Sequence, residues 1–344
     1  MKRLQVLCAC LLCFYSCTTL AGRIVNVYLI GGEIPQQLIW AFEKETGINV
    51  NVSTYDTNET MYAKLRANKN NIYDVIIPSS YFVERLKRYH LLEKLDPQKL
   101  SNLKNIDPFF RNNPFDPGNH YHVPLTWGTT GLFYNQHWIK NPPHKWQDLW
   151  NPRWRHQLLL VDDIRDVFAM SLLSLGYDPN DTAPKHIDEA YQHLLKLVDN
   201  IKLFGSDAIK SLIIDEDVHI GMSWSGEIVK SQAENPNIRY VYPEDGVLLW
   251  VDCLAIPKHA PHLDAAYAFI NFLLRAQSGA DIVLHQGYSV TNQASLALLP
   301  PKVRRNPNIF PNKTILKRGH YQRDVDEKTI ELYSKYWEKL KLAC

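Results

Sequence analysis

The chain has 344 residues, of which 45% are hydrophobic, and its 38 Lys and Arg residues nearly balance 36 Asp and Glu residues. This apolar content with so little net charge excludes a disordered protein, because it suffices to build a large core. A formal net charge of +2 also argues against nucleic-acid binding, which needs an excess of cationic side chains. The length fits one large or two medium-sized domains.

Residues 1–21 have the pattern of a secretory signal peptide. Lys2 and Arg3 precede a short apolar stretch, and small residues follow up to Ala21. Removing 21 of the 344 residues leaves 323, with 36 charges of each sign. We therefore expect an exported, periplasmic protein. Lipid anchoring at Cys17 is an alternative that we rank lower, because bulky residues precede this cysteine.

Cys253 and Cys344 are the cysteines that follow this segment. Two thiols in an exported chain of this size do not make a disulfide framework, so the hydrophobic core must stabilise the fold. The sequence leaves open whether they pair, because spacing along the chain does not give their distance in space.

The first part of the chain predicts a βαβ unit followed by a further helix and strand. The pattern indicates strands over residues 24–30, 48–55 and 73–77, and helices over residues 35–45 and from about residue 58. Such a unit predicts a parallel sheet covered by helices. Ligands bind beyond the carboxyl ends of parallel strands, which here are Ile30-Gly31-Gly32-Glu33 and Ser79-Ser80-Tyr81. We expect two site loops there.

An extended segment over residues 123–134 follows, and then the α/β alternation resumes. We expect strands over residues 158–161, 221–224 and 248–257. We expect helices from about 164 to 175, over 190–198 and over 264–274, and a last helix whose apolar face spans residues 330–340. The simplest architecture has two α/β lobes. Lobe one would hold residues 22–128 and 252–307, and lobe two residues 129–251 and 308–344.

Motifs for catalysis are absent from the sequence. It contains no Gly-x-x-x-x-Gly-Lys, Gly-x-Gly-x-x-Gly or His-Glu-x-x-His motif, and Ser225 stands where a nucleophile elbow around Ser223 needs its second glycine. His120 and His122 could face one side of a strand as metal ligands, but a polar loop is the simpler interpretation. We therefore predict no enzyme, no catalytic residue, no metal and no cofactor.

Acidic and aromatic residues gather at the predicted strand ends. Trp250 and Asp252 stand two residues apart and so share one face of a strand. The other members are Asp163, Asp166, Trp224, Tyr81 and Tyr288. Carboxylates can offset the desolvation of ammonium groups, and each cation–π contact adds about 0.5 to 2 kcal/mol. The set suits an elongated organic cation, although core packing alone explains any single ring equally well.

Several blocks of sequence carry a resemblance to a known family. They include FEKETGI at 42–48, NETMYAKL at 58–65 and INFLL at 270–274, with shorter matches at 53–55, 73–75, 78–79, 148–150 and 252–257. These blocks resemble the spermidine/putrescine-binding proteins of polyamine ABC importers, from about residue 24 to the last helix. The resemblance implies a two-lobed α/β solute-binding protein of type II topology with its ligand cleft between the lobes. It also implies delivery of a polyamine to an inner-membrane permease, and we expect a monomer.

Position by position, the resemblance implies a set of ligand contacts. These are Ser79, Tyr81, Asp163, Asp166, Trp224, Trp250, Asp252, Tyr288 and Gln322. Asp166 stands where the family often has Glu, and Asp252 matches the acid that holds an amino group of the polyamine.

One departure from the family follows the first strand. The family has an aromatic residue, Ser or Thr, an acid and Tyr, where this chain has Ile30, Gly31, Gly32 and Glu33. Either Glu33 replaces the missing carboxylate as a ligand contact, or this end of the site is wider and less acidic. We expect a polyamine to bind, without a choice among polyamines. The alternatives are another small organic cation, an amino-acid-like solute, or a sensor that retains the fold.

Overall fold

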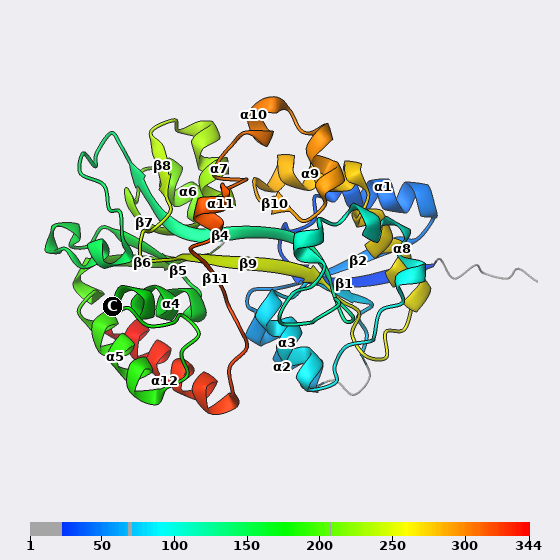
Figure 1. Cartoon of the computed structure of the whole chain (residues 1–344), viewed down its shortest axis with the longest axis horizontal. Helices are drawn as coiled ribbons and strands as arrows, with labels where there is room; N and C mark the ends of the chain where they lie inside the picture. The colour runs from blue at the N-terminus through cyan, green and yellow to red at the C-terminus, as the bar shows by residue number, and fades with distance from the viewer. Residues whose placement is uncertain (1–22, 68–70, 207) are drawn as a thin grey trace, which may run out of the picture.

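The protein is described by a computed structural model that covers residues 23–67, 71–206 and 208–344. The predicted signal peptide and Cys17 lie outside the described residues. The chain forms two halves joined by two long strands, β4 (Val123–Asn135) and β9 (Val247–Leu254), which pair antiparallel and run from one half into the other (Figure 1). The two-lobed α/β fold predicted from the sequence is confirmed.

The predicted βαβ unit forms the start of the first half. Its parallel sheet has the order β2-β1-β3, with β1 at Ile24–Ile30, β2 at Asn49–Tyr55 and β3 at Val75–Ile76. The helices of this half are α1 (Gln36–Thr46), α2 (Asn58–Ala67), α3 (Ser80–Arg88), α8 (Leu263–Leu273), α9 (Ala276–Gln286) and α10 (Pro301–Arg304). Helix α11 (Lys313–Leu316) follows in the stretch that leads to the second half. Gly47 ends α1 in the left-handed region, with φ of 67°.

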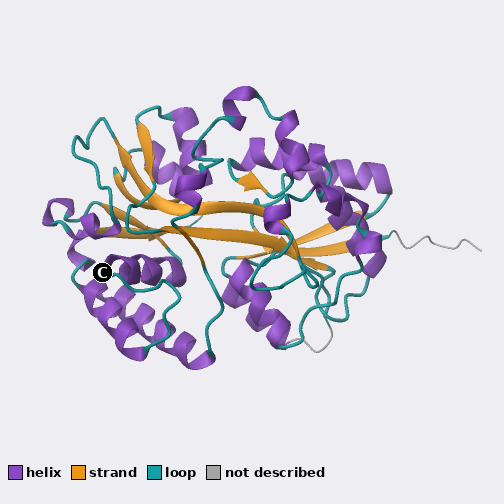
Figure 2. Cartoon of the chain, in the orientation of Figure 1, coloured by secondary structure: helices purple, strands orange, loops and turns teal. Residues whose placement is uncertain are grey.

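The second half is built on the larger sheet, with strand order β11-β9-β4-β7-β5-β6. Its further strands are β5 (Leu158–Val161), β6 (Ile201–Gly205), β7 (Ile220–Trp224) and β11 (Gly319–Tyr321), while β8 (Ile238–Val241) and β10 (Ser289–Val290) pair with β4. The helices are α4 (Ile164–Ser174), α5 (Pro184–Leu195), α6 (Ile209–Ile214), α7 (Ser225–Glu234) and α12 (Glu327–Ala343). Helices flank the strands in both halves (Figure 2).

Two hydrophobic clusters stabilise the two halves. One draws buried residues from 25–127 and 251–309, and the other from 132–248 and 325–340. The two ends of β4 and of β9 thus contribute to different clusters. The chain passes once more from the first cluster to the second between Ile309 and Val325. The lobe boundaries at 128, 252 and 308 stay a prediction.

The structure differs from some sequence expectations. The helix expected over residues 190–198 is α5 (Pro184–Leu195), which starts earlier because Pro184 has a backbone angle suited to the first helical turn. Helices α3, α6, α7, α9, α10 and α11 were not predicted. Polar residues interrupt the buried face of α3, and Ser, Gly and Gln interrupt that of α9. Cys253 is buried, Cys344 is exposed, and both are free thiols.

His122, one of the two histidines considered as metal ligands, belongs to a polar cluster. Nδ1 of the buried His122 lies 2.9 Å from Oδ2 of Asp116, and Nε2 lies 3.3 Å from Nδ2 of Asn113. Within the described ranges, no group of three or more His, Cys, Asp or Glu residues could hold a metal ion. The same residues include no helix long and apolar enough to cross a membrane.

The buried carboxylate of Asp74 joins β1 to the start of α8. It accepts hydrogen bonds from the backbone N–H groups of Asn26 at 2.7 Å and His262 at 2.6 Å. We expect Asp74→Ala to lower the free energy of unfolding by about 2 to 4 kcal/mol, because it leaves these donors without a partner. Urea denaturation should show this loss of stability, and Asp56→Ala, at an exposed position, serves as the control. Equal midpoints in the two variants would contradict this role.

Candidate functional site

The predicted site residues collect along one face of the β4–β9 pair. Asp252 lies opposite Thr126 and Trp250 lies opposite Gly128 in the antiparallel register. Residues two apart on a strand share a face, so Asp252 and Trp250 point the same way. A Cβ atom on Gly128 would lie 2.4 Å from Cζ2 of Trp250. The indole therefore lies directly over the β4 backbone, and only glycine leaves room for it there.

Asp252 marks one end of this face. Its Oδ1 accepts a 2.7 Å hydrogen bond from Oγ of Ser79, the residue before α3. Asn58 holds Ser79 in turn, since its Nδ2 donates to Oγ at 3.2 Å and its Oδ1 accepts from the backbone N–H at 3.1 Å. Burial raises the pKa of Asp252 to about 6, although the bond from Ser79 opposes this shift.

A second carboxylate, that of Glu33, lies near Asp252. Glu33 sits in the turn after β1, where its backbone N–H donates to the carbonyl of Ile30 at 3.1 Å and Gln286 of α9 donates to the carbonyl of Gly32. Both Glu33 carboxylate oxygens are buried and find no hydrogen-bond donor among the described residues. Burial and the neighbouring charge of Asp252 hold the pKa of Glu33 well above its ordinary value.

Asp166 marks the other end of the same face. Its Oδ2 accepts from Oγ1 of Thr130 on β4 at 2.9 Å and from Nε1 of Trp224 at 3.0 Å. Its Oδ1 accepts from Nε2 of Gln322 at 2.5 Å. Three neutral donors therefore orient the carboxylate, and the nearby charge of Arg165 lowers its pKa against the effect of burial.

Asp163 adds a second carboxylate at the Asp166 end. It caps α4, because its Oδ1 accepts from the backbone N–H of Asp166 at 2.9 Å. Burial raises the pKa of both carboxyl groups, and the charge of Asp163 raises that of Asp166 further. Each end of the face thus holds a pair of carboxylates.

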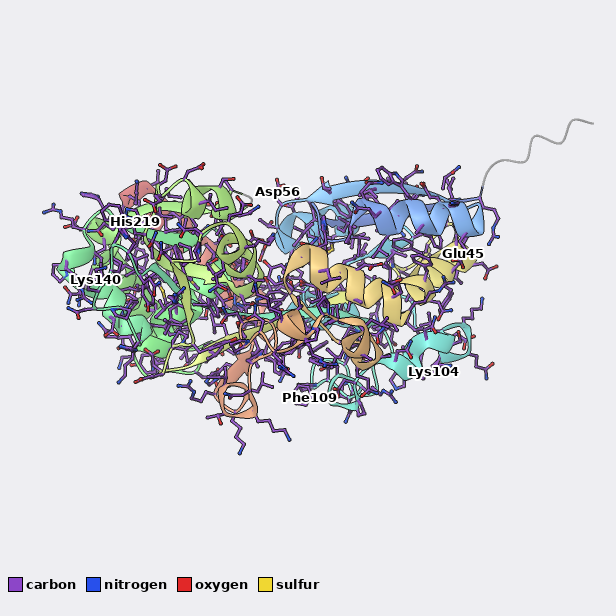
Figure 3. The ribbon with its side chains drawn as sticks, turned by 90° about the horizontal axis from the view of Figure 1, so that it is seen from above. Glu45, Asp56, Lys104, Phe109, Lys140 and His219 are labelled. Carbon is purple, nitrogen blue, oxygen red and sulfur yellow. The ribbon has the colours of Figure 1, made fainter. Side chains whose placement is uncertain are left out.

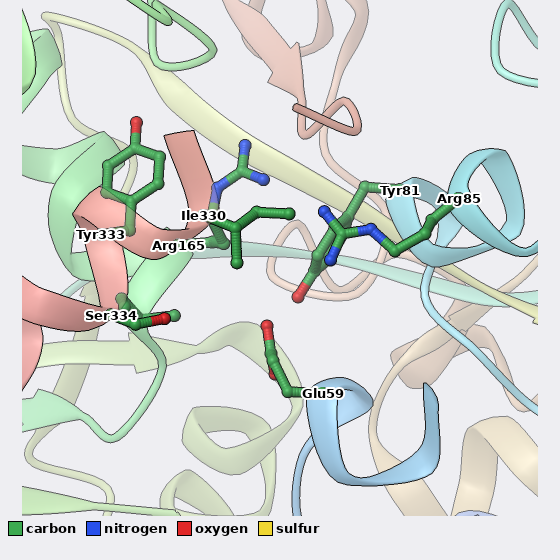
Figure 4. A pocket seen from close by; sticks show the side chains of 8 residues that line it. Glu59, Tyr81, Arg85, Arg165, Ile330, Tyr333 and Ser334 are labelled. Carbon is green, nitrogen blue, oxygen red and sulfur yellow. The ribbon is translucent and has the colours of Figure 1, made fainter. Parts of the chain in front are cut away.

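The two predicted tyrosines occupy different places. The ring of Tyr288 meets the indole of Trp250 edge-on, with centroids 4.9 Å apart, and its hydroxyl donates to Oε1 of Glu227 at 3.2 Å. Tyr81 lines a cavity of about 30 Å³ between α2 and α3 on one side and α4 and α12 on the other. Glu59 also lines this cavity, and its carboxylate points toward the Tyr81 hydroxyl (Figure 4).

Sequence reasoning missed the residues that hold the predicted ones. Thr130 stands two positions after Gly128 and so shares its face, which the extended pattern of β4 could have indicated. Asn58 starts the helix after β2, at the site end of the sheet. Glu227 is a charged residue in the first turn of a helix, which no sequence pattern separates from an ordinary surface residue.

The distance between the two acidic ends follows from β4. Thr126, opposite Asp252, and Thr130, bonded to Asp166, are four residues apart, which corresponds to about 13 Å along a strand. The Trp250 indole lies between them. This arrangement suits an elongated solute that carries positive charge at both ends and an apolar chain between.

Comparisons with known proteins agree with this architecture. The family model for bacterial extracellular solute-binding proteins matches residues 37–311. The spermidine/putrescine-binding periplasmic protein of Salmonella typhimurium is 39% identical over 309 residues, which cover 90% of this chain and 88% of the relative. The putrescine-binding periplasmic protein PotF of Escherichia coli is 31% identical over 362 positions, covering 99% and 98%. A solved structure from Listeria monocytogenes, described as a spermidine/putrescine ABC transporter, has a TM-score of 0.91 at 33% identity and covers 94% and 100%.

The raised pKa of Asp252 predicts how stability depends on pH. Between its ordinary pKa of 3.8 and about 6, the folded protein binds more protons at this group than the unfolded chain, so ionisation destabilises the fold as the pH rises. Asp252→Asn removes this effect. We expect the variant to gain on the order of 1 to 3 kcal/mol relative to wild type between pH 4 and pH 7 in urea denaturation.

Comparing the variant with wild type cancels the contribution of the buried histidines to the pH dependence of stability. Burial lowers the pKa of His193 to about 4, which makes stability rise with pH in both proteins alike. The exposed Asp215→Asn serves as the control and should keep the wild-type pH profile. A constant stability difference between Asp252→Asn and wild type across this range would show that Asp252 has an ordinary pKa.

Proposed function

Because this chain belongs to the family of bacterial extracellular solute-binding proteins, we propose that it captures a linear polyamine and delivers it to the membrane permease of an ABC importer. The observation that carries the proposal is the pair of acidic ends on one strand face, with an indole between them. The names of the similar proteins from Salmonella typhimurium and Escherichia coli point to the same class of ligand.

At one end, a terminal ammonium group would lie between Asp252 and Glu33. The Asp252 carboxylate is oriented by Ser79, and the buried Glu33 oxygens are free to accept. In this role Glu33 takes the place of the carboxylate that the family carries one position earlier. An ammonium group with charge-assisted hydrogen bonds to both carboxylates would offset the repulsion between them.

At the other end, Asp166 and Asp163 would receive the second terminal ammonium group. Trp224 and Gln322 orient Asp166 and contribute polar contacts at the same place. The methylene chain would pack on the Trp250 indole, with Tyr288 against the indole edge and Tyr81 on the α3 side. Aromatic faces suit both the methylene groups and an internal ammonium group.

The spacing of the ends favours a triamine over a diamine. An extended spermidine separates its terminal nitrogens by about 11 Å and putrescine by about 6 Å, from ordinary single-bond lengths. The acidic ends are about 13 Å apart at the backbone, and their side chains shorten the gap. Spermidine can therefore reach both carboxylate pairs, whereas putrescine can contact only one pair directly.

We place the site between two lobes that close on the ligand. Lobe one consists of residues 22–128 and 252–307 and lobe two of residues 129–251 and 308–344, and each half has its own hydrophobic cluster. Such lobes move as units about the strands that join them. In this proposal the protein is a monomer, and it is exported to the periplasm after removal of residues 1–21.

The first test is the contribution of Asp252 to affinity. We expect isothermal titration to show binding of spermidine to wild type, and Asp252→Asn to weaken it by about 2 kcal/mol or more, roughly 30-fold, because a buried ammonium group loses its charged partner. Asp215→Asn, an exposed acid on lobe two, should bind as wild type does. No heat from putrescine, cadaverine, spermidine or spermine would refute the proposed function. Unchanged affinity in Asp252→Asn would refute the site assignment.

The second test is selectivity by length. We expect spermidine to bind wild type at least about 10-fold more tightly than putrescine, because it adds charge-assisted contacts at the second end. Asp166→Asn should weaken spermidine binding more than putrescine binding if the diamine prefers the Asp252 end. Competition titrations with both ligands on both proteins measure this. Equal affinities for the two ligands in wild type would contradict the spacing argument.

A further inference from the structure

The segment between β11 and α12 passes between the two halves beside the site (Figure 1). Its first residue, Gln322, is 4% exposed and donates to Asp166. The backbone N–H of Arg323 donates to Oδ1 of Asn180 at 2.8 Å, and Nη2 of Arg165 donates to the carbonyl of Arg323 at 3.1 Å. These contacts fix the segment to the second half.

Helix α3 of the first half holds the same segment through ion pairs. Arg323 forms a bidentate pair with Glu84, with Nε 3.2 Å from Oε2 and Nη2 3.0 Å from Oε1. Arg85 donates to Oδ1 of Asp324 at 3.0 Å from Nε and 2.7 Å from Nη2, and Nη2 of Arg88 lies 3.0 Å from Oδ2. The Asp324 side chain is 0% exposed and that of Arg85 is 7% exposed.

Helix α3 connects these ion pairs to the ligand end of lobe one. Ser79 precedes the helix and orients Asp252, while Phe82 and Leu86 pack in the first hydrophobic cluster. The segment after β11 is bound to the second half and leads to α12, whose Tyr333 packs in the second cluster. Any opening of the lobes that separates α3 from this segment must break both the bidentate Glu84–Arg323 pair and the Arg85–Asp324 pair.

We propose that the Glu84–Arg323 and Arg85–Asp324 ion pairs form a latch that holds the lobes closed and slows ligand release. This inference rests on the proposed function, because it assigns these side chains a part in polyamine retention. They are positioning residues, which act on the site through Gln322 on one side and Ser79 on the other. The bidentate Glu84–Arg323 pair suits this role because its two parallel hydrogen bonds require one specific geometry, and the buried Asp324 would lose its charged partners if the pair with Arg85 opened.

The latch can be tested with one substitution and a matched control. Glu84→Gln keeps the size of the side chain but removes its charge and replaces one of its two acceptor oxygens with an amide donor. Glu45→Gln does the same to the exposed bidentate Glu45–Arg275 pair, at 2.7 and 2.6 Å. Glu45 lies near the outer end of lobe one, away from lobe two (Figure 3).

We expect stopped-flow measurements to show that spermidine dissociates about 3- to 10-fold faster from Glu84→Gln than from wild type, with the association rate changed by less than about 2-fold. Arg323→Gln, which removes the pair from the other side, should match Glu84→Gln. The control should keep the wild-type rate. Equal dissociation rates in wild type, Glu84→Gln and Arg323→Gln would overturn the latch.

Small-angle X-ray scattering separates failure of the latch from failure of the proposed function. Without ligand, the latch predicts a larger radius of gyration for Glu84→Gln than for wild type and Glu45→Gln. Identical scattering of the three proteins would overturn it. A wild type that binds no polyamine refutes the proposed function, while the scattering comparison still decides the latch.

Discussion

The site depends on the burial of four carboxylates, Glu33, Asp163, Asp166 and Asp252, that form no ion pair among the described residues, although the nearby charge of Arg165 acts on Asp163 and Asp166. The donors that contact three of them are neutral side chains or backbone groups, from Ser79, Thr130, Trp224, Gln322 and the start of α4. Glu33 has no donor among the described residues. Burying charge in this way opposes folding, and burial accordingly raises the pKa of each group. Ionising these groups inside the fold is therefore costly, and a bound cation would reduce that cost.

The same arrangement of carboxylates favours ligand affinity and lowers the stability of the fold. Neutral donors orient the carboxylates yet leave their charge available, whereas a lysine or arginine at these positions would stabilise the fold and compete with the ligand. Arg165 lies close enough to lower the pKa of Asp163 and Asp166, while other arginines pair with Asp324 and Glu84 further from the site. In the proposed latch these outer cationic side chains stabilise the closed arrangement, while the proposed ligand-binding acids lack ion-pair partners among the described residues. Stored electrostatic strain at a functional site is offset by contacts elsewhere.

Sequence patterns predicted those parts of the site that obey a strand period. Trp250 and Asp252 share a face because they are two apart, and the tip of β3 predicted Ser79. Gln322 lies 156 positions from Asp166, and no local pattern connects them, so only the resemblance to a family indicated that contact. The strands and the helix of the βαβ unit were predictable from apolar periodicity. Helices α3 and α9 were missed because polar residues break their buried faces.

The turn after β1 shows how a local departure from a family pattern can leave the charge of a site intact. Gly32 has φ of 79°, a left-handed conformation that a side chain would strain, and its carbonyl accepts from Gln286 of α9. This turn gives up the indole, hydroxyl and tyrosine of the family but aims Glu33, the residue after it, toward Asp252. Because glutamate reaches one methylene further than aspartate, a shift of one position along the chain can be made up by side-chain length. In the proposed function this end of the site keeps two carboxylates and loses aromatic cover, so polyamine binding there would rest on charge more than on stacking.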